Sequence, residues 1–206
     1  MTENRGEDKD FMAKFVLSGF SDEMDRDLQV QVKELKRLGI SRMEMRFVYG
    51  KNSVDYSLAE MKEMKKQLDA AGVSVSAIGS PLGKIGIADP FGPHLDLFKH
   101  TLELARLLET RYIRMFSFYI PEGGDPADYR DEVLERWNAF TGEARGAGII
   151  LAHENEKGIY GEDAATCLEL FEALYGEHFK GIFDFANFVQ CGQDTVEAYN
   201  VLNPYI

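Results

Sequence analysis

The sequence predicts an α/β protein of the (β/α)₈ barrel type, with about six βα units present in its 206 residues. Short apolar runs begin near residues 15, 42, 73, 112, 149 and 182. Amphipathic segments lie between these runs, an alternation that indicates repeated βα units and a parallel sheet. Polar residues follow the runs, as at the mouth of a barrel. An open doubly wound sheet would instead carry a glycine-rich loop after its first strand, where residues 17–21 contain one glycine.

Local signals define the individual elements. Between Asp27 and Leu38, leucine and valine recur at spacings of three and four, which predicts an amphipathic helix ended by Gly39. Ser57 and Glu60 form a capping box at the start of the next helix. By the same reasoning, the predicted strands are 15–17, 40–47, 73–78, 112–116, 149–156 and 182–184, and the predicted helices are 27–38, 57–71, 94–109, 129–145, 162–175 and 195–202.

Length, composition and charge limit the classes of protein to consider. Residues 1–13 are polar and are predicted to be a disordered leader, followed by a single domain over residues 14–206. The formal net charge of −12 argues against nucleic acid or an anionic membrane surface as a partner. Two cysteines without metal-type spacing, and the lack of a signal-peptide core, favour a cytoplasmic protein. The sequence leaves open whether the chain forms a homo-oligomer.

Two carboxylates end neighbouring predicted strands. Glu154 closes the apolar run that begins at Ile149, and Asp184 closes the next run, about thirty residues later. Adjacent parallel strands bring such residues to one edge of the sheet, where hard oxygen ligands suit Mn²⁺ or Mg²⁺. The alternative is that both carboxylates serve only the fold, by capping loops or by pairing with Arg114 or Lys180. We therefore regard Glu154 and Asp184 as candidates for half of a metal site.

Several other polar residues are candidates for substrate binding. Arg46, Lys84 and Arg114 would form a local basic pocket for an anionic substrate, which an acidic protein can still bind. Glu44 shares a strand face with Arg46, so the two either contact substrate or pair with each other. Glu156 is either a substrate group or a solvated loop carboxylate.

The histidines are not expected to bind a metal. Strand alternation turns His153 to the face opposite Glu154, which predicts a packed side chain facing the helices. His94, His100 and His178 lack metal-ligand spacing and are predicted to lie at the surface.

Four stretches of the sequence, in this order, are "ELKRLGISRMEMR", "LDAAGVSVSAIGSPLGK", "LAHENEKGIYG" and "GIFDFANF". Together they resemble the sugar phosphate isomerase/epimerase family of xylose-isomerase-like barrels, which is related to the endonuclease IV group. The resemblance implies a divalent metal, most often Mn²⁺, with Mg²⁺, Co²⁺ or Zn²⁺ as alternatives. It assigns the ligand after strand five to Glu154 and the ligand after strand six to Asp184. Asn187 stands where the family often has a histidine near the substrate.

The resemblance implies a metal-dependent isomerase or epimerase of a small carbohydrate or sugar phosphate. Glu154 would bind the metal and shuttle a proton through an enediolate. The family's remaining ligands, a histidine after strand seven and a glutamate after strand eight, would follow Ile206, so we expect the 206 residues to be part of a longer barrel. The alternatives are a keto-inositol or polyol dehydratase on the same scaffold, and a non-catalytic ligand-binding or assembly module. An endonuclease role is disfavoured by the net charge.

Overall fold

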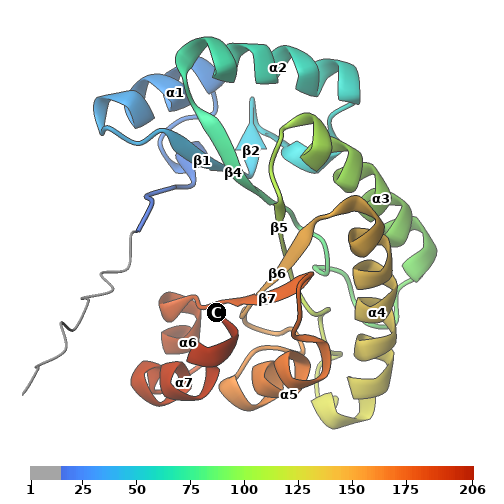
Figure 1. The fold of residues 1–206 in the computed structure, drawn as a ribbon. Coiled ribbons are helices and arrows are strands. Elements are labelled where there is room, and N and C mark those ends of the chain that lie inside the picture. Colours follow the sequence, from blue (N-terminus) through green and yellow to red (C-terminus); the bar gives the residue numbers. More distant parts are fainter. Residues whose placement is uncertain (1–14) are drawn as a thin grey trace, which may run out of the picture.

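A computed structural model describes residues 15–206, so the predicted leader lies outside the described residues. Five parallel strands form one sheet in which each strand pairs with the next along the chain (Figure 1). Within the described residues the sheet does not close into a ring. The strands are β1 (Arg42–Met45), β4 (Ser74–Gly79), β5 (Tyr112–Met115), β6 (Ile150–Glu154) and β7 (Phe179–Ile182), beside an antiparallel hairpin of β2 (Phe47–Val48) and β3 (Lys51–Asn52).

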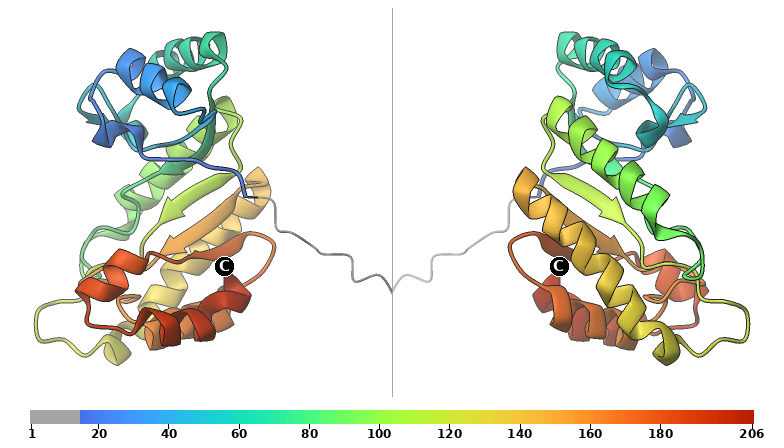
Figure 2. Two further views of the ribbon diagram at one scale, coloured as in Figure 1. Left: turned by 90° about the vertical axis from the view of Figure 1, so that its left-hand side faces the viewer. Right: turned by 90° about the vertical axis from the view of Figure 1, so that its right-hand side faces the viewer.

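Helices line one face of this curved sheet, as the three views of Figures 1 and 2 show. None of the helices within residues 15–206 has the length and apolar character needed to cross a membrane. The helices are α1 (Leu28–Arg37), α2 (Leu58–Ala71), α3 (Phe91–Leu107), α4 (Arg130–Ala147), α5 (Ala164–Leu174), α6 (Phe185–Gln190) and α7 (Thr195–Leu202), with 3₁₀ turns at Ser21–Glu23, Ser53–Asp55, Pro126–Tyr129 and Asn203–Tyr205.

The predicted helix boundaries follow from capping. The Ser57 side chain accepts the N–H of Glu60 while the Glu60 carboxylate accepts the N–H of Ser57, which completes the predicted capping box of α2. Gly72 ends the same helix in the left-handed conformation, with φ of 71°. Asp27 caps α1 by accepting two backbone N–H groups, so the helix begins one residue after the predicted start.

The hydrophobic core lies between the sheet and its helices. Alternate strand residues such as Ile113 and Leu151 are fully buried on this side, together with Phe98, Trp137 and Phe140 of α3 and α4. The other set of alternate residues faces the concave side of the sheet. A cavity of about 440 Å³ lies on that side and is lined by Ser76, Tyr112, Arg114, Ala152, Lys180 and Ile182. Strand alternation thus separates the hydrophobic core from a face of the sheet that is open to ligands.

Two predicted strands are wrong in position. Residues 15–17 form no strand, because their side chains are exposed and the backbone first meets the sheet at Gly19, in a single bridge to Met43. An apolar run without hydrogen-bonding partners along its length does not form a strand. The last strand spans 179–182 rather than 182–184, because the backbone of Asp184 begins α6 instead of extending β7. The sequence analysis also did not predict α6 or the β2–β3 hairpin.

Candidate functional site

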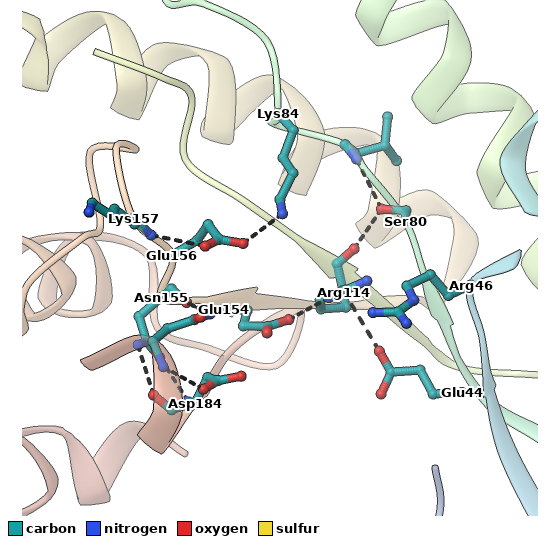
Figure 3. Close-up of polar contacts among 12 residues, drawn as sticks. Glu44, Arg46, Ser80, Lys84, Arg114, Glu154, Asn155, Glu156, Lys157 and Asp184 are labelled. Atoms are coloured by element: carbon teal, nitrogen blue, oxygen red, sulfur yellow. Dashed lines mark hydrogen bonds and ion pairs between the residues drawn. The ribbon is translucent and has the colours of Figure 1, made fainter. Parts of the chain in front are cut away.

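The carboxylates of Glu154 and Asp184 leave adjacent parallel strands at the same edge of the sheet, as predicted. Asn155 joins the two strand ends (Figure 3): its Oδ1 accepts the N–H of Asp184 at 2.8 Å, and its Nδ2 donates to the carbonyl of Asp184 at 3.0 Å. Asn187 adds a third link by donating from Nδ2 to the carbonyl of Asn155 at 2.9 Å. These three bonds fix the spacing between the ends of β6 and β7.

Asn155 is a residue whose role the sequence analysis missed. It is 1 % exposed: its side-chain amide bonds to the backbone of Asp184, and its backbone carbonyl accepts from Nδ2 of Asn187. The only available signal was its position, directly after the carboxylate that ends a buried strand. Spacing along the chain does not reveal which backbone groups an amide will pair with across two strands.

Arg114 lies between two carboxylates (Figure 3). Its Nη1 donates to Oε2 of Glu154 at 2.8 Å, and its Nε lies 3.7 Å from Oε1 of Glu44. The side chains of Arg114 and Glu154 are 8 % and 9 % exposed. A Cβ on Gly79 would lie 3.0 Å from Nη2 of Arg114 and 3.2 Å from Oε1 of Glu44, so glycine at this position gives the cluster its room. The ion pair of Glu154 with Arg114 is one of the fold-serving contacts that the sequence left open.

Burial dominates the electrostatics of these carboxylates. It raises the pKa of Glu154, an effect that the Arg114 guanidinium opposes and that the charge of Asp184 reinforces. Burial likewise raises the pKa of Glu44, again opposed by Arg114. The repulsion between Glu154 and Asp184 means that a cation placed between them would be favoured.

The donor set at Glu154 and Asp184 fits a hard divalent cation. Glu154 uses Oε2 for Arg114, and Asp184 uses Oδ1 to accept the N–H of Asn187 at 2.8 Å as the N-cap of α6. Each carboxylate therefore has a second oxygen for a ligand, and oxygen ligands are those that Mn²⁺ and Mg²⁺ prefer. Within residues 15–206, no group of three or more His, Cys, Asp or Glu side chains is arranged to hold a metal ion.

A single cavity of about 220 Å³ is lined by the three basic residues that were predicted to bind an anionic substrate, Arg46, Lys84 and Arg114. We call it the cation cavity. Arg46 does not pair with Glu44, because it donates to Asp22 at 2.9 Å and to Glu23 at 3.1 Å. Lys84 pairs with Glu156 at 2.6 Å, so Glu156 is not a free loop carboxylate. The lining of the cation cavity includes Arg46, Asn52, Ser80, Lys84, Arg114 and Phe116.

Two histidines, His153 and His94, are buried, and the sequence predicted this only for His153. His153 faces the helices as predicted: it is fully buried, packs on Trp137, and its Nε2 lies 2.9 Å from Oγ of Ser117. His94 is not at the surface, because it is 8 % exposed and its Nε2 accepts the N–H of Gly83 at 2.7 Å. This bond anchors the loop that carries Lys84.

We expect His94 to make the protein sensitive to acid. Burial, aided by the charge of Arg136, lowers the pKa of His94 from 6.5 to about 4. The unfolded chain therefore binds this proton at a higher pH than the folded chain, and stability should fall as the pH drops from about 6.5 to about 4, by about 3 kcal/mol. Urea unfolding at pH 7 and pH 4.5 measures this, and His94→Gln should lose less stability between the two pH values. An unchanged loss in the variant would contradict the assignment.

Comparisons with known proteins agree with this fold. A sequence model of the xylose isomerase-like TIM barrel family matches residues 32–206. The probable 3-DHS dehydratase AsbF from Bacillus anthracis superposes with a TM-score of 0.75 at 16% identity, over 93% of this chain and 71% of AsbF. A comparison with curated proteins gives no match.

Two further solved structures are similar. A xylose isomerase-like TIM barrel protein from Mycobacterium smegmatis, in complex with magnesium, superposes with a TM-score of 0.73 at 18% identity, over 93% of this chain and 72% of that protein. A D-tagatose 3-epimerase-like protein gives a TM-score of 0.73 at 16% identity, over 91% and 72% of the two chains. At these identities the superpositions establish the fold, and the family match covers most of the chain. The chain therefore belongs to the xylose isomerase-like TIM barrel family.

Proposed function

We propose that this chain contributes to a metal-dependent isomerase or epimerase that acts on a small sugar or sugar phosphate. The observation that carries the proposal is the pair of carboxylates at the ends of β6 and β7, held in register by Asn155. In this family of barrels, similar solved structures include a D-tagatose 3-epimerase-like protein and a magnesium complex, which supports both the reaction class and a divalent ion.

The proposed roles follow from the positions of the side chains. Glu154 and Asp184 would bind a divalent ion, with Mn²⁺ as the first candidate, which when bound polarises a substrate carbonyl and its neighbouring hydroxyl. Glu154 would also move the proton between neighbouring carbons, because its carboxylate would lie beside a carbonyl bound to that ion. Arg114 holds Glu154 in place through Oε2. Asn187, which already bonds to Asn155, lies next to this pair and would contact the substrate.

A calorimetric Mn²⁺ titration tests the metal proposal directly. We expect micromolar binding that Glu154→Gln and Asp184→Asn each abolish, because each removes a charged oxygen ligand. Asp194→Asn is the matched control, since Asp194 caps α7 as Asp184 caps α6 and asparagine is an equally good cap. Equal binding in all variants would remove Glu154 and Asp184 from the metal site.

Assays of substrate turnover distinguish an isomerase or epimerase from a dehydratase and from a ligand-binding module. With Mn²⁺ bound, an isomerase or epimerase exchanges a substrate C–H proton with deuterium from heavy water, without loss of water from the product. Release of water would instead identify a dehydratase. Mn²⁺ binding without either reaction, across ketoses and their phosphates, would favour a ligand-binding module.

A further inference from the structure

We infer that the substrate carries an anionic group, a carboxylate or a phosphate, which binds in the cation cavity beside the paired carboxylates. The inference rests on the proposed function for the identity of the ligand as a substrate, whereas anion binding in the cavity is a property of the chain by itself. Arg46, Lys84 and Arg114 come from three different strand ends and meet at this one cavity.

The wall of the cation cavity has one sign of charge. No carboxylate from residues 15–206 lines it, although every cation in it has a carboxylate partner. The partners set the positions of the cations, as Figure 3 shows for Lys84 and Arg114. These partners are Asp22 and Glu23 for Arg46, Glu156 for Lys84, and Glu44 and Glu154 for Arg114. A ligand in the cavity therefore contacts three positive groups and no carboxylate of the described residues.

The cations retain unused hydrogen-bond donors. An ammonium has three N–H donors, and Glu156 accepts one from Lys84. A guanidinium has five, and Nε of Arg114 is buried without a hydrogen-bond partner. The acceptor nearest to this Nε is Oε1 of Glu44, at 3.7 Å. The donors left for a ligand are therefore the remaining N–H groups of Lys84 Nζ and of the two Nη atoms of Arg114.

Neutral groups complete the cavity. The ring of Phe116 contacts Lys84 Nζ at 4.2 Å from its centroid and Arg114 Cζ at 4.9 Å, so one aromatic ring contacts both cations. Asn52 uses Oδ1 to accept the N–H of Val54, which leaves the donor end of its amide for a ligand. Ser80 is buried and donates to the carbonyl of Arg114 at 2.5 Å, which fixes the backbone beneath the guanidinium.

The volume of the cavity indicates which part of a substrate it holds. About 220 Å³ is less than a whole small-molecule site usually occupies, so the cavity suits one substituent. Arg114 also bonds Glu154, and it therefore connects the anion to the carboxylates proposed to bind the metal. The reacting carbonyl would lie at Glu154 and Asp184, with the anionic group on the opposite side of Arg114.

Titration calorimetry of the metal-free protein with inorganic phosphate and, separately, glycolate tests the inference. We expect the parent to bind at least one of them, with phosphate binding pointing to a phosphorylated substrate and glycolate binding alone to a carboxylate. Lys84→Gln and Arg46→Gln should each weaken binding about tenfold, the loss of one charge-assisted hydrogen bond. Lys84→Arg should retain binding. Lys99→Gln is the matched control, because Lys99 also pairs with a glutamate but lies on α3, away from the cavity.

Two results would overturn the inference: no binding of either anion to the parent at tens of millimolar, or equal binding to the parent and to Lys84→Gln. Lys84 is half-buried at the cavity wall, so its variant should fold even if Arg46→Gln does not. A parallel Mn²⁺ titration keeps this inference distinct from the proposed function. Anion binding without Mn²⁺ binding would retain the cation cavity and reject the metal proposal, and the reverse result would reject only the cation cavity.

Discussion

Replacing Arg114 with methionine should lower the free energy of unfolding by about 3–5 kcal/mol at pH 7, the usual cost of breaking a buried ion pair from one side. Arg114 and Glu154 are both more than nine-tenths buried, and Glu44 shares the same guanidinium. Without it, Glu154 would lose its ion-pair partner, and Glu44 would keep only the more distant charge of Arg46. Urea unfolding followed by circular dichroism measures the difference.

The pH dependence of the Arg114→Met variant tests whether unpaired carboxylates cause its loss of stability. Burial already raises the pKa of Glu154 and of Glu44 in the folded protein, and Arg114 opposes that rise. A group with a raised folded pKa favours folding most when it is protonated, so its penalty grows as pH rises through the folded pKa. The loss caused by Arg114→Met should therefore be smaller at pH 5 than at pH 7. Adding Glu154→Gln should recover part of it, and a double variant as unstable as the sum of the two single variants would contradict this account.

The sequence was sufficient to predict the βα repeat and the places where polar residues leave the sheet. Local signals determine those features: the capping box at Ser57, the glycine at 72, and the apolar run that ends at Glu154. Because parallel strands bring their carboxyl ends to one edge, the order of the elements alone places Glu154 near Asp184. The family resemblance seen in four short stretches is confirmed by the match over residues 32–206.

The sequence did not predict which side chains pair with one another. Glu44 and Arg46 share a strand face, yet Arg46 pairs with Asp22 and Glu23 from the preceding 3₁₀ turn. That choice depends on where a loop crosses the sheet, which strand periodicity does not determine. His94 is similar, since its burial depends on the return of the loop at Gly83 rather than on its position in α3. The end of β7 was misplaced because Asp184 serves as a helix cap, a role that an apolar run does not reveal.

Adding one methyl group at Gly83 should destabilise the protein by about 3 kcal/mol or more, because two penalties combine there. Gly83 has φ of 86°, a conformation that L side chains rarely adopt. A Cβ at this position would clash with the carbonyl oxygen of Phe116, a backbone atom that cannot turn aside. The carbonyl of Gly83 accepts the N–H of Phe118, and the carbonyl of Leu82 accepts the N–H of Phe116, so the two loops cannot separate without losing both bonds.

Gly72→Ala is the matched control for Gly83→Ala. Gly72 has nearly the same positive φ, 71°, but a Cβ there meets no atom within 4 Å, so its substitution should cost only the conformational penalty of about 1 kcal/mol. The difference in the free energy of unfolding between the two variants measures the cost of the close contact between the β4–α3 loop and the end of β5. Equal losses would show that the loops are not in contact. Because Lys84 follows Gly83 directly, a displaced loop should also weaken phosphate binding in the cation cavity, whereas Gly72→Ala should leave it unchanged.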